Sequence, residues 1–229
     1  MTSLFDASGP LRQSWPSAYA FACTSLSFAS CYVYSPRASG ATAEASRLMC
    51  ARVKSGDPLW LPRYAGCVHE ASRRDAELAA LFGGSPALVP VPGSTVSSES
   101  PWAAERLAVA LVGVGLGGRL APALRRHFTV RKSATSPVGH RPSVREHYES
   151  FAMFRPLIVA DKIVLVDDVI TKGRTLLAAA ARLRTELPHA DIRAFALIRT
   201  VGFVPRMERV MEVCHGTVRW AGGDARREP

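Results

Sequence analysis

Short apolar runs alternate with longer helical stretches along this chain. Ile163–Val166 is a run of four β-branched or Leu residues with charge on both sides, which predicts a strand buried on both faces of a parallel sheet. Leu176–Arg184 follows after a short turn and is rich in Ala and Leu, which predicts a helix. This strand, turn and helix are the clearest pattern in the sequence.

The rest of the chain repeats the alternation. Strands are expected at Tyr32–Tyr34, Ala87–Val91, Phe128–Val130 and Ile192–Ile198, and helices at Thr42–Lys54, Ser72–Leu81 and Pro101–Val112. In the first helix Thr42 is a candidate cap, and Leu48, Met49 and Val53 are expected to face inward. Strands that alternate with helices predict an α/β fold with a doubly wound, mainly parallel sheet.

Length and composition fit one domain. With 229 residues and 48% hydrophobic content, the chain can bury a sizeable core. We expect a single domain over 1–229, with an N-terminal extension or hood at 1–85, a core at 86–202 and a flexible tail at 221–229. The extension holds several aromatic residues, namely Trp15, Tyr19, Tyr32, Tyr34 and Trp60.

The net charge is +10, and the excess is uneven. From Arg106 to Arg145 there are eight Lys or Arg residues and no Asp or Glu. Either a polyanionic small ligand or nucleic acid would explain such a basic block. The charge does not choose between the two.

The five cysteines include no C-x-x-C pair, so neither a zinc ribbon nor a disulfide framework is indicated. Free thiols in a reducing cytoplasm are the simplest interpretation. Ala18–Ser30 is partly apolar, but Arg12 is the only cation before it, and no run reaches the roughly 20 apolar residues of a membrane span. We therefore expect a cytoplasmic protein without a membrane partner.

Candidate chemistry gathers after the strand Ile163–Val166. Asp167 and Asp168 are expected at its carboxyl end, the edge of a parallel sheet where ligands bind. Carboxylates are strong acceptors for sugar hydroxyls and favour a nearby divalent cation.

The next turn is Thr171, Lys172, Gly173, Arg174 and Thr175. It would offer hydroxyls, a close backbone approach and the amides of a helix start to a phosphate group.

The segment Val164–Thr175, VLVDDVITKGRT, resembles the phosphoribosyl-diphosphate motif of type I phosphoribosyltransferases. The resemblance implies that Asp167 and Asp168 hold the ribose 2- and 3-hydroxyls and stabilise positive charge on the sugar. It also implies that the turn binds the 5-phosphate, and that water links the acids to Mg²⁺. Lys172 departs from the pattern, because the family usually has a small residue there.

Residues 48–202 resemble the ComF-like branch of that family, chiefly through Val89–Pro92 (VPVP). The resemblance assigns Gly93, Ser94 and Thr95, with Arg131, Lys132 and Arg145, to the diphosphate, and adds His147 and Lys54 as candidate ligand contacts. Unlike those proteins, this chain lacks the zinc ribbon. It also has Glu99 and Trp102 where they carry Arg and Asn.

A dinucleotide-binding site is the first alternative function to consider. Gly113–Gly118 satisfies G-x-G-x-x-G, but no acid follows about 20 residues on, so a dinucleotide site is not indicated. The leading hypothesis is a Mg²⁺-dependent phosphoribosyltransferase with an unidentified nitrogenous acceptor; homodimers are common in that family. The alternative is a non-catalytic phosphoribosyl-diphosphate-binding or DNA-associated protein on the same fold.

Overall fold

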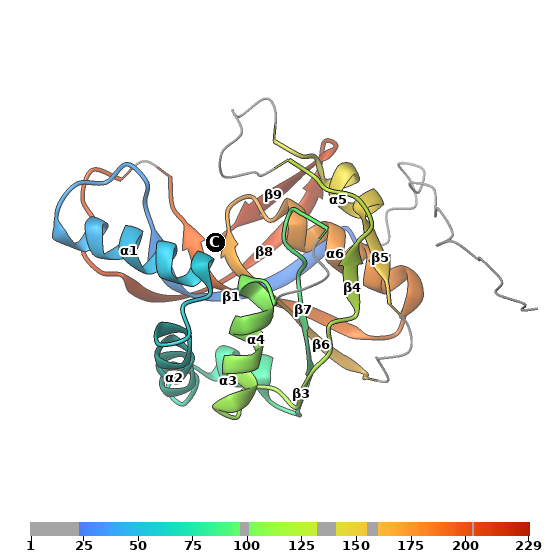
Figure 1. Ribbon diagram of the computed structural model, residues 1–229, viewed down its shortest axis with the longest axis horizontal. Helices are drawn as coiled ribbons and strands as arrows, with labels where there is room; N and C mark the ends of the chain where they lie inside the picture. The colour runs from blue at the N-terminus through green and yellow to red at the C-terminus, as the bar shows by residue number, and fades with distance from the viewer. Residues whose placement is uncertain (1–22, 97–100, 132–140, 155–159, 203) are drawn as a thin grey trace, which may run out of the picture.

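The computed structural model describes residues 23–96, 101–131, 141–154, 160–202 and 204–229, which form mixed α/β structure (Figure 1). The elements in chain order are β1 (Ser25–Tyr34), α1 (Ala41–Ser55), α2 (Trp60–Ser72), α3 (Ala76–Phe82), β2 (Ala87–Pro90), α4 (Ala103–Gly113), β3 (Arg119–Leu120), β4 (Leu124–Arg126), α5 (Val144–Ser150), β5 (Phe151–Met153), β6 (Lys162–Ile170), α6 (Arg174–Glu186), β7 (Asp191–Thr200), β8 (Met211–Ala221) and β9 (Asp224–Glu228).

A seven-stranded sheet forms the centre of the molecule, in the order β3-β2-β6-β7-β1-β8-β9. The five strands from β3 to β1 are parallel, whereas β8 is antiparallel to β1 and β9 to β8. A separate antiparallel pair joins β4 to β5. The mostly parallel sheet flanked by helices confirms the α/β class and is compatible with a doubly wound fold.

Strand β6 shows how the sheet divides the core. Ile163 and Leu165 pack into the cluster that contains α5 and α6, whereas Val164 and Val166 pack into the cluster that contains α1 to α4. All four side chains are fully buried. Because successive strand residues point to opposite faces, a continuous apolar run is needed when helices cover both faces.

The acid pair lies inside a strand rather than after it. Strand β6 continues to Ile170, since Asp167 pairs with Ala196 and Val169 with Ile198 of β7. The apolar run therefore predicted the strand but not its length, because hydrogen bonding to β7 extends it through the polar residues.

The helix expected at Ser72–Leu81 is interrupted. Helix α2 ends at Ser72, and α3 begins at Ala76, where the Asp75 carboxylate accepts a hydrogen bond from the Leu78 amide at 2.8 Å. Aspartate is favoured as a helix cap and disfavoured inside a helix, which explains the break. Helix α2 was not predicted from the sequence.

Helix α1 was predicted with small errors. It begins one residue earlier than expected, with Gly40 as the N-cap and no side-chain cap, so Thr42 is not the capping residue. Met49 and Val53 are buried as expected, but Leu48 is 52% exposed. The inward side of α1 is completed by the small residues Ala43 and Ser46.

The strand expected at Phe128–Val130 lies earlier in the chain, as β4, and Phe128 itself is 41% exposed.

The C-terminal region differs most from the expectation. Beyond β7 the chain adds β8 and β9, so the segment 221–229, expected to be a flexible tail, contains the edge strand Asp224–Glu228. Charged residues are well tolerated on an edge strand, which is why its polar sequence did not reveal it.

Strand β1 lies within the segment expected to be an N-terminal hood, yet it occupies an internal position of the sheet between β7 and β8. Trp15 and Tyr19 fall outside the described residues. Within the described part of the chain, no helix combines the length and apolarity needed to cross a bilayer.

Candidate functional site at the carboxyl edge of the sheet

The predicted ligand segments come together because parallel strands end at one edge of the sheet. Strand β2 pairs with β6 up to Pro90 and Val166, and the Val91 amide still donates to the Val166 carbonyl at 2.9 Å. The loop Gly93–Thr95 therefore begins beside Asp167. The loop Thr171–Thr175 follows β6 at the same edge, as the sequence predicted.

Asp167 and Asp168 are adjacent residues of β6 whose carboxylates interact with each other, but their nearest cations differ: Arg126 lies near Asp167 and Lys54 near Asp168. Each carboxylate accepts the amide of the following residue, Asp168 N–H to Asp167 at 2.9 Å and Val169 N–H to Asp168 at 2.9 Å. Burial, and then the adjacent Asp168 carboxylate, raise the pKa of Asp167 well above its ordinary value. The two acids therefore experience different environments.

Lys54 faces Asp168 from the last turn of α1. Its Nζ lies 3.9 Å from Asp168 Oδ2, with the two side chains 46% and 21% exposed. Helix α1 stops two residues later at Gly56, whose left-handed φ of 67° and close approach to Arg106 leave no room for a Cβ. This geometry places the predicted lysine beside the acid pair.

Arg126 occupies the other side, and sequence analysis did not single it out. Only 6% of the residue is exposed, and its guanidinium donates to the Gly93 carbonyl, to Ser150 Oγ and, at 3.1 Å, to His147 Nδ1. Burial lowers its pKa to about 10, an effect that the charge of Asp167 opposes. Arg126 thus supplies positive charge behind the acid pair, and its hydrogen bonds with the described residues all go to neutral groups.

His147 connects Arg126 to the start of α6. Arginine can only donate, so Nδ1 accepts and Nε2 carries the hydrogen, which points at Thr175 Oγ1 3.4 Å away. Burial and the Arg126 charge lower the pKa of His147 to about 3, so the ring is neutral at physiological pH. The sequence predicted a loop histidine open to phosphate, whereas this side chain is buried in α5 with both nitrogens engaged.

Within the segment Thr171–Thr175 the loop ends at Gly173, which caps α6 with a φ of 81°, so Arg174 and Thr175 lie in the first turn of the helix. A Cβ at Gly173 would come within 2.5 Å of Val218 on β8, so both the conformation and the packing require glycine. The β8–β9 hairpin therefore lies directly against this loop (Figure 1).

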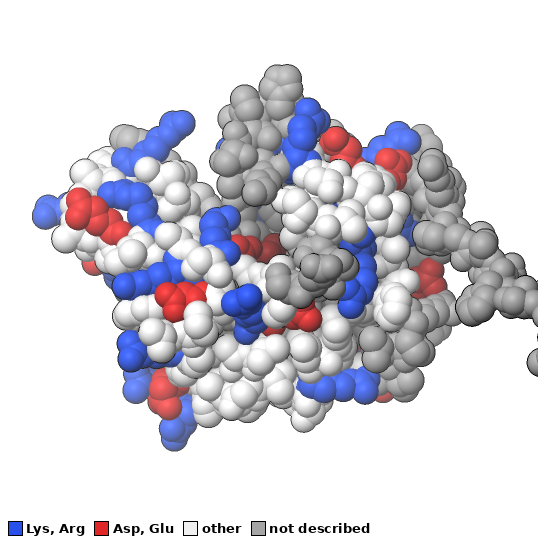
Figure 2. Space-filling model, in the orientation of Figure 1, with Lys and Arg blue, Asp and Glu red and all other residues white. Residues whose placement is uncertain are grey.

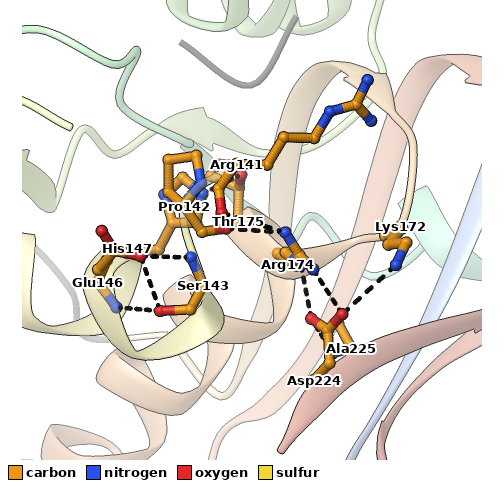
Figure 3. Close-up of polar contacts among 10 residues, drawn as sticks. All are labelled: Arg141, Pro142, Ser143, Glu146, His147, Lys172, Arg174, Thr175, Asp224 and Ala225. Carbon is orange, nitrogen blue, oxygen red and sulfur yellow. Dashed lines mark hydrogen bonds and ion pairs between the residues drawn. The ribbon is translucent and has the colours of Figure 1, made fainter. Parts of the chain in front are cut away.

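Two cations of the loop are turned toward that hairpin (Figure 3). Arg174 forms a bidentate pair with Asp224, with Nε to Oδ1 at 2.5 Å and Nη2 to Oδ2 at 2.6 Å, and Lys172 Nζ lies 3.5 Å from Oδ2. The hydrogen bond to Asp224 raises the pKa of Arg174. Burial alone would raise the pKa of Asp224, but the hydrogen bonds from Arg174 and from the Ala225 amide, together with the charges of Arg174 and Lys172, lower it.

Arg174 also ties α6 to the segment before α5. Its Nη1 donates to the carbonyls of Arg141 at 3.4 Å and Pro142 at 3.2 Å (Figure 3). Helix α5 then starts with a capping box in which Ser143 and Glu146 bond each other's amides. The positions of α5 and of its His147 are thereby fixed relative to the Thr171–Thr175 loop.

The other cations expected at a diphosphate do not converge on the acids. Arg131 lies 3.4 Å from Glu146, and Arg145 lies 2.8 Å from Glu149, with both arginines more than half exposed. Lys132 and Glu99 lie outside the described residues. Trp102 has a structural contact, since its indole N–H donates to the Val91 carbonyl at 2.7 Å.

The basic block between Arg106 and Arg145 does not form one free surface. Arg126 is buried, Arg131 and Arg145 are ion-paired, and Arg106 donates to the carbonyls of Pro101 and Gly56. Figure 2 shows Lys and Arg interleaved with Asp and Glu over the face in view.

The fold defines the protein as an α/β protein with a polar site at the carboxyl edge of a parallel sheet. A scan of protein-family models gives no match to the chain, and a comparison with curated proteins finds none with significant similarity. The resemblance to type I phosphoribosyltransferases therefore stays a prediction.

Proposed function

We propose that this protein is a phosphoribosyltransferase that displaces pyrophosphate from phosphoribosyl diphosphate with a nitrogenous acceptor. The observation that supports this proposal is the meeting of three segments at one sheet edge: the acid pair Asp167 and Asp168, the loop Gly93–Thr95, and the loop Thr171–Thr175 before α6. These segments suit the three parts of that ligand, a ribose with two hydroxyls, a diphosphate and a 5-phosphate.

Each part of the ligand would meet a different chemistry. Asp167 and Asp168 would accept hydrogen bonds from the ribose hydroxyls, and a cation bound beside them would oppose the raised pKa of Asp167 and favour the ionised form. The ionised pair would stabilise the positive charge that develops as the bond to pyrophosphate breaks. The amides at the start of α6, with Thr171 and Thr175, receive the 5-phosphate. The backbone of the Gly93–Thr95 loop, held from behind by Arg126, receives the diphosphate.

Lys54 would stabilise the negative charge that forms on the leaving pyrophosphate. It lies beside Asp168 and is 46% exposed, so its ammonium group can leave the carboxylate and bind a phosphate oxygen. Orientation and electrostatic stabilisation would account for most of the rate, since the reaction needs no covalent nucleophile.

The acid pair fits a magnesium ion held jointly with the ligand. Each carboxylate has one oxygen that takes no backbone amide, and within the described chain no group of three His, Cys, Asp or Glu side chains forms a metal site. Asp167 and Asp168 would therefore contact Mg²⁺ through water, while the ligand's own oxygens complete its shell. When bound, the ion would neutralise charge on the leaving diphosphate.

Calorimetry with phosphoribosyl diphosphate tests the proposal. Binding to the wild type should require Mg²⁺ and should be lost in Asp167→Ala/Asp168→Ala. Failure of the wild type to bind the ligand with Mg²⁺ would refute a phosphoribosyl-diphosphate site. Release of pyrophosphate during an acceptor screen would then demonstrate catalysis.

A non-catalytic binder on the same site is the second candidate. It is favoured by the pairing of Arg174 and Lys172 with Asp224, which withdraws two cations from the loop that would bind the 5-phosphate. Tight binding without pyrophosphate release, whatever the acceptor, would support this role. The dispersed and paired cations of the basic block give no similar support to DNA binding.

A further inference from the structure

A cavity of about 590 Å³ lies between the Thr171–Thr175 loop and the β8–β9 hairpin, and we call it the hairpin cavity. Thr171 and Lys172 line it from the loop, and Asp224, Arg226 and Arg227 line it from β9. Neither acid of the sheet edge takes part in its lining. The hairpin cavity is therefore separate from the site described above, although it shares a loop with that site.

The hairpin cavity is positively charged. Its one acidic side chain, Asp224, already gives both carboxylate oxygens to Arg174, which does not line the cavity. Lys172 is 55% exposed at 3.5 Å from the same carboxylate. Three cations therefore face a space whose single anion is neutralised from outside.

Arg227 is the best-placed of these cations. Its guanidinium donates to the carbonyls of Ile170 at 3.1 Å and Thr200 at 2.8 Å, which fixes its position at the ends of β6 and β7. Within the described chain it has no carboxylate partner, and both burial and the like charge of Arg199 lower its pKa. The contacts with Ile170 and Thr200 use two of its five N–H groups, so the others can bind an anion.

Arg226 and Thr171 complete the set. Arg226 is exposed, and its side chain forms no hydrogen bond or ion pair with any residue that the structure describes. The Thr171 hydroxyl lies 3.3 Å from that of Thr200 and can also donate to a ligand. A fixed arginine, a free arginine, a lysine and a hydroxyl around one space are the groups that recognise phosphate.

We propose that the hairpin cavity binds a second, phosphate-bearing small molecule. Its volume lies within the range of small-ligand sites. The proposal also gives Lys172 a role, since this long cation, which departs from the expected motif, points into the hairpin cavity rather than along the axis of α6. Lys172 would then serve the hairpin cavity, while the 5-phosphate is held by Thr171, Thr175 and the amides at the start of α6.

The two sites should weaken each other, and this part of the inference rests on the proposed function. Both use Thr171, and two anions bound on either side of one short loop repel each other. By linkage, phosphate in the hairpin cavity lowers the affinity for phosphoribosyl diphosphate by the same factor as the reverse. We expect a several-fold effect that is smaller in Arg226→Ala.

Calorimetry with inorganic phosphate and, separately, with AMP tests the site itself on the full chain. In Arg226→Ala we expect the affinity for either probe to fall about tenfold, as for the loss of one charge-assisted hydrogen bond. Arg219→Ala is the matched control, because Arg219 lies opposite Arg226 in the β8–β9 ladder but is paired with Glu228 at 3.1 Å. That control should bind within about twofold of the wild type.

Equal phosphate and AMP affinities in wild type and Arg226→Ala, or binding of neither probe to the wild type, would overturn the proposal. If AMP binds more tightly than phosphate, the ligand is a nucleotide; equal affinities assign it to the phosphate group alone. The double variant Asp167→Ala/Asp168→Ala should lose phosphoribosyl diphosphate but keep the Arg226-dependent affinity. The failure of one proposal therefore leaves the other to stand.

Discussion

Two adjacent acids of strand β6 present the same chemical group in opposite settings. Asp167 lies on the side of Arg126 and His147, which are 6% and 3% exposed and bonded at several atoms. Asp168 faces Lys54, a half-exposed side chain at 3.9 Å. Asp167 therefore lies beside buried, hydrogen-bonded side chains, whereas the partner of Asp168, Lys54, can move away into solvent. We call these the buried side and the open side of the site.

This difference suggests a division of labour. The buried side connects the Gly93–Thr95 loop, through Arg126 and His147, to Thr175, so it holds the distance between the expected diphosphate and 5-phosphate positions. The open side can exchange Lys54 for a ligand or a hydrated cation at little cost, because exposed ion pairs contribute little to stability. Variants on the two sides should therefore differ first in folding and then in binding.

The largest effect is expected from Arg126→Met. This change leaves the Gly93 carbonyl and the hydroxyl of Ser150 without their donor, and it removes the group that faces His147 Nδ1. We expect the free energy of unfolding to fall by roughly 3–5 kcal/mol, as for other buried charged networks that lose one member. Urea denaturation measures it.

Arg125→Met is the matched control for that experiment. Arg125 is the adjacent residue of β4, but it is exposed; among the described residues it lies over the ring of Phe154, 5.5 Å from its centroid, and near the Glu105 carboxylate. Its loss should cost less than about 1 kcal/mol. Similar losses at Arg125 and Arg126 would show that the buried network is not the stronger side.

The sequence predicted the acids and Lys54 but not Arg126, because the burial of Arg126 depends on contacts between distant parts of the chain. Asp167, Asp168 and Lys54 stand out locally, as acids after an apolar run and a lysine at a helix end. Arg126 is one arginine among eight basic residues. Its burial depends on the pairing of β4 with β5, about 25 residues further along the chain, which no local pattern encodes.

The ion pair between Arg174 and Asp224 could not be predicted from the sequence either, because it also joins distant parts of the chain. Asp224 lies 50 residues downstream, on an edge strand whose sequence, DARRE, reads as a polar tail. The turn expected at Thr171–Thr175 therefore follows β6 as predicted, although its last two residues belong to α6, and the partner of its two cations was not foreseen. Local patterns fixed which segments form the sheet edge, but tertiary pairing decides which charges there stay free.

Asp168→Asn should have the second largest effect, on binding rather than folding. Asparagine keeps the shape and can still accept the Val169 amide, so we expect the free energy of unfolding to change by less than about 1 kcal/mol. Affinity for phosphoribosyl diphosphate should fall roughly 10- to 100-fold, because an anionic acceptor for a ribose hydroxyl is lost. Calorimetry with Mg²⁺ present measures this, and a stability loss with unchanged affinity would contradict the assignment.

A third test uses the neutral state of His147. The folded-state pKa lies at about 3, below the ordinary value of 6.5, so between these values the unfolded chain binds a proton that the folded protein does not. The stability contribution is present above pH 6.5 and is lost as the pH falls toward about 3, with a slope of up to about 1.4 kcal/mol per pH unit.

His147→Gln isolates that slope. Glutamine offers both an acceptor and a donor but does not titrate, whereas Asp167, whose raised pKa acts in the opposite direction, remains in both proteins. The difference between the two curves of unfolding free energy against pH should therefore shrink steadily below pH 6.5. Parallel curves from pH 7 to 4 would mean that His147 takes up its proton at the same pH in the folded protein as in the unfolded chain.

The smallest change in stability is expected from Lys54→Met, on the open side. Its ion pair with Asp168 is exposed, so the free energy of unfolding should change by less than about 1 kcal/mol. Affinity for phosphoribosyl diphosphate should nevertheless fall about tenfold at low salt, and the difference from wild type should narrow as salt screens the charge.

Arg73→Met provides the comparison for Lys54, because Arg73 forms a surface pair with Glu70 at 3.6 Å, just beyond the end of α2 and away from the sheet edge. It should match Lys54→Met in stability and the wild type in affinity. If Lys54→Met also keeps full affinity, the contact with Asp168 is an ordinary surface pair. The open side would then have no cation for the ligand, and the diphosphate would depend on the backbone that Arg126 holds from the buried side.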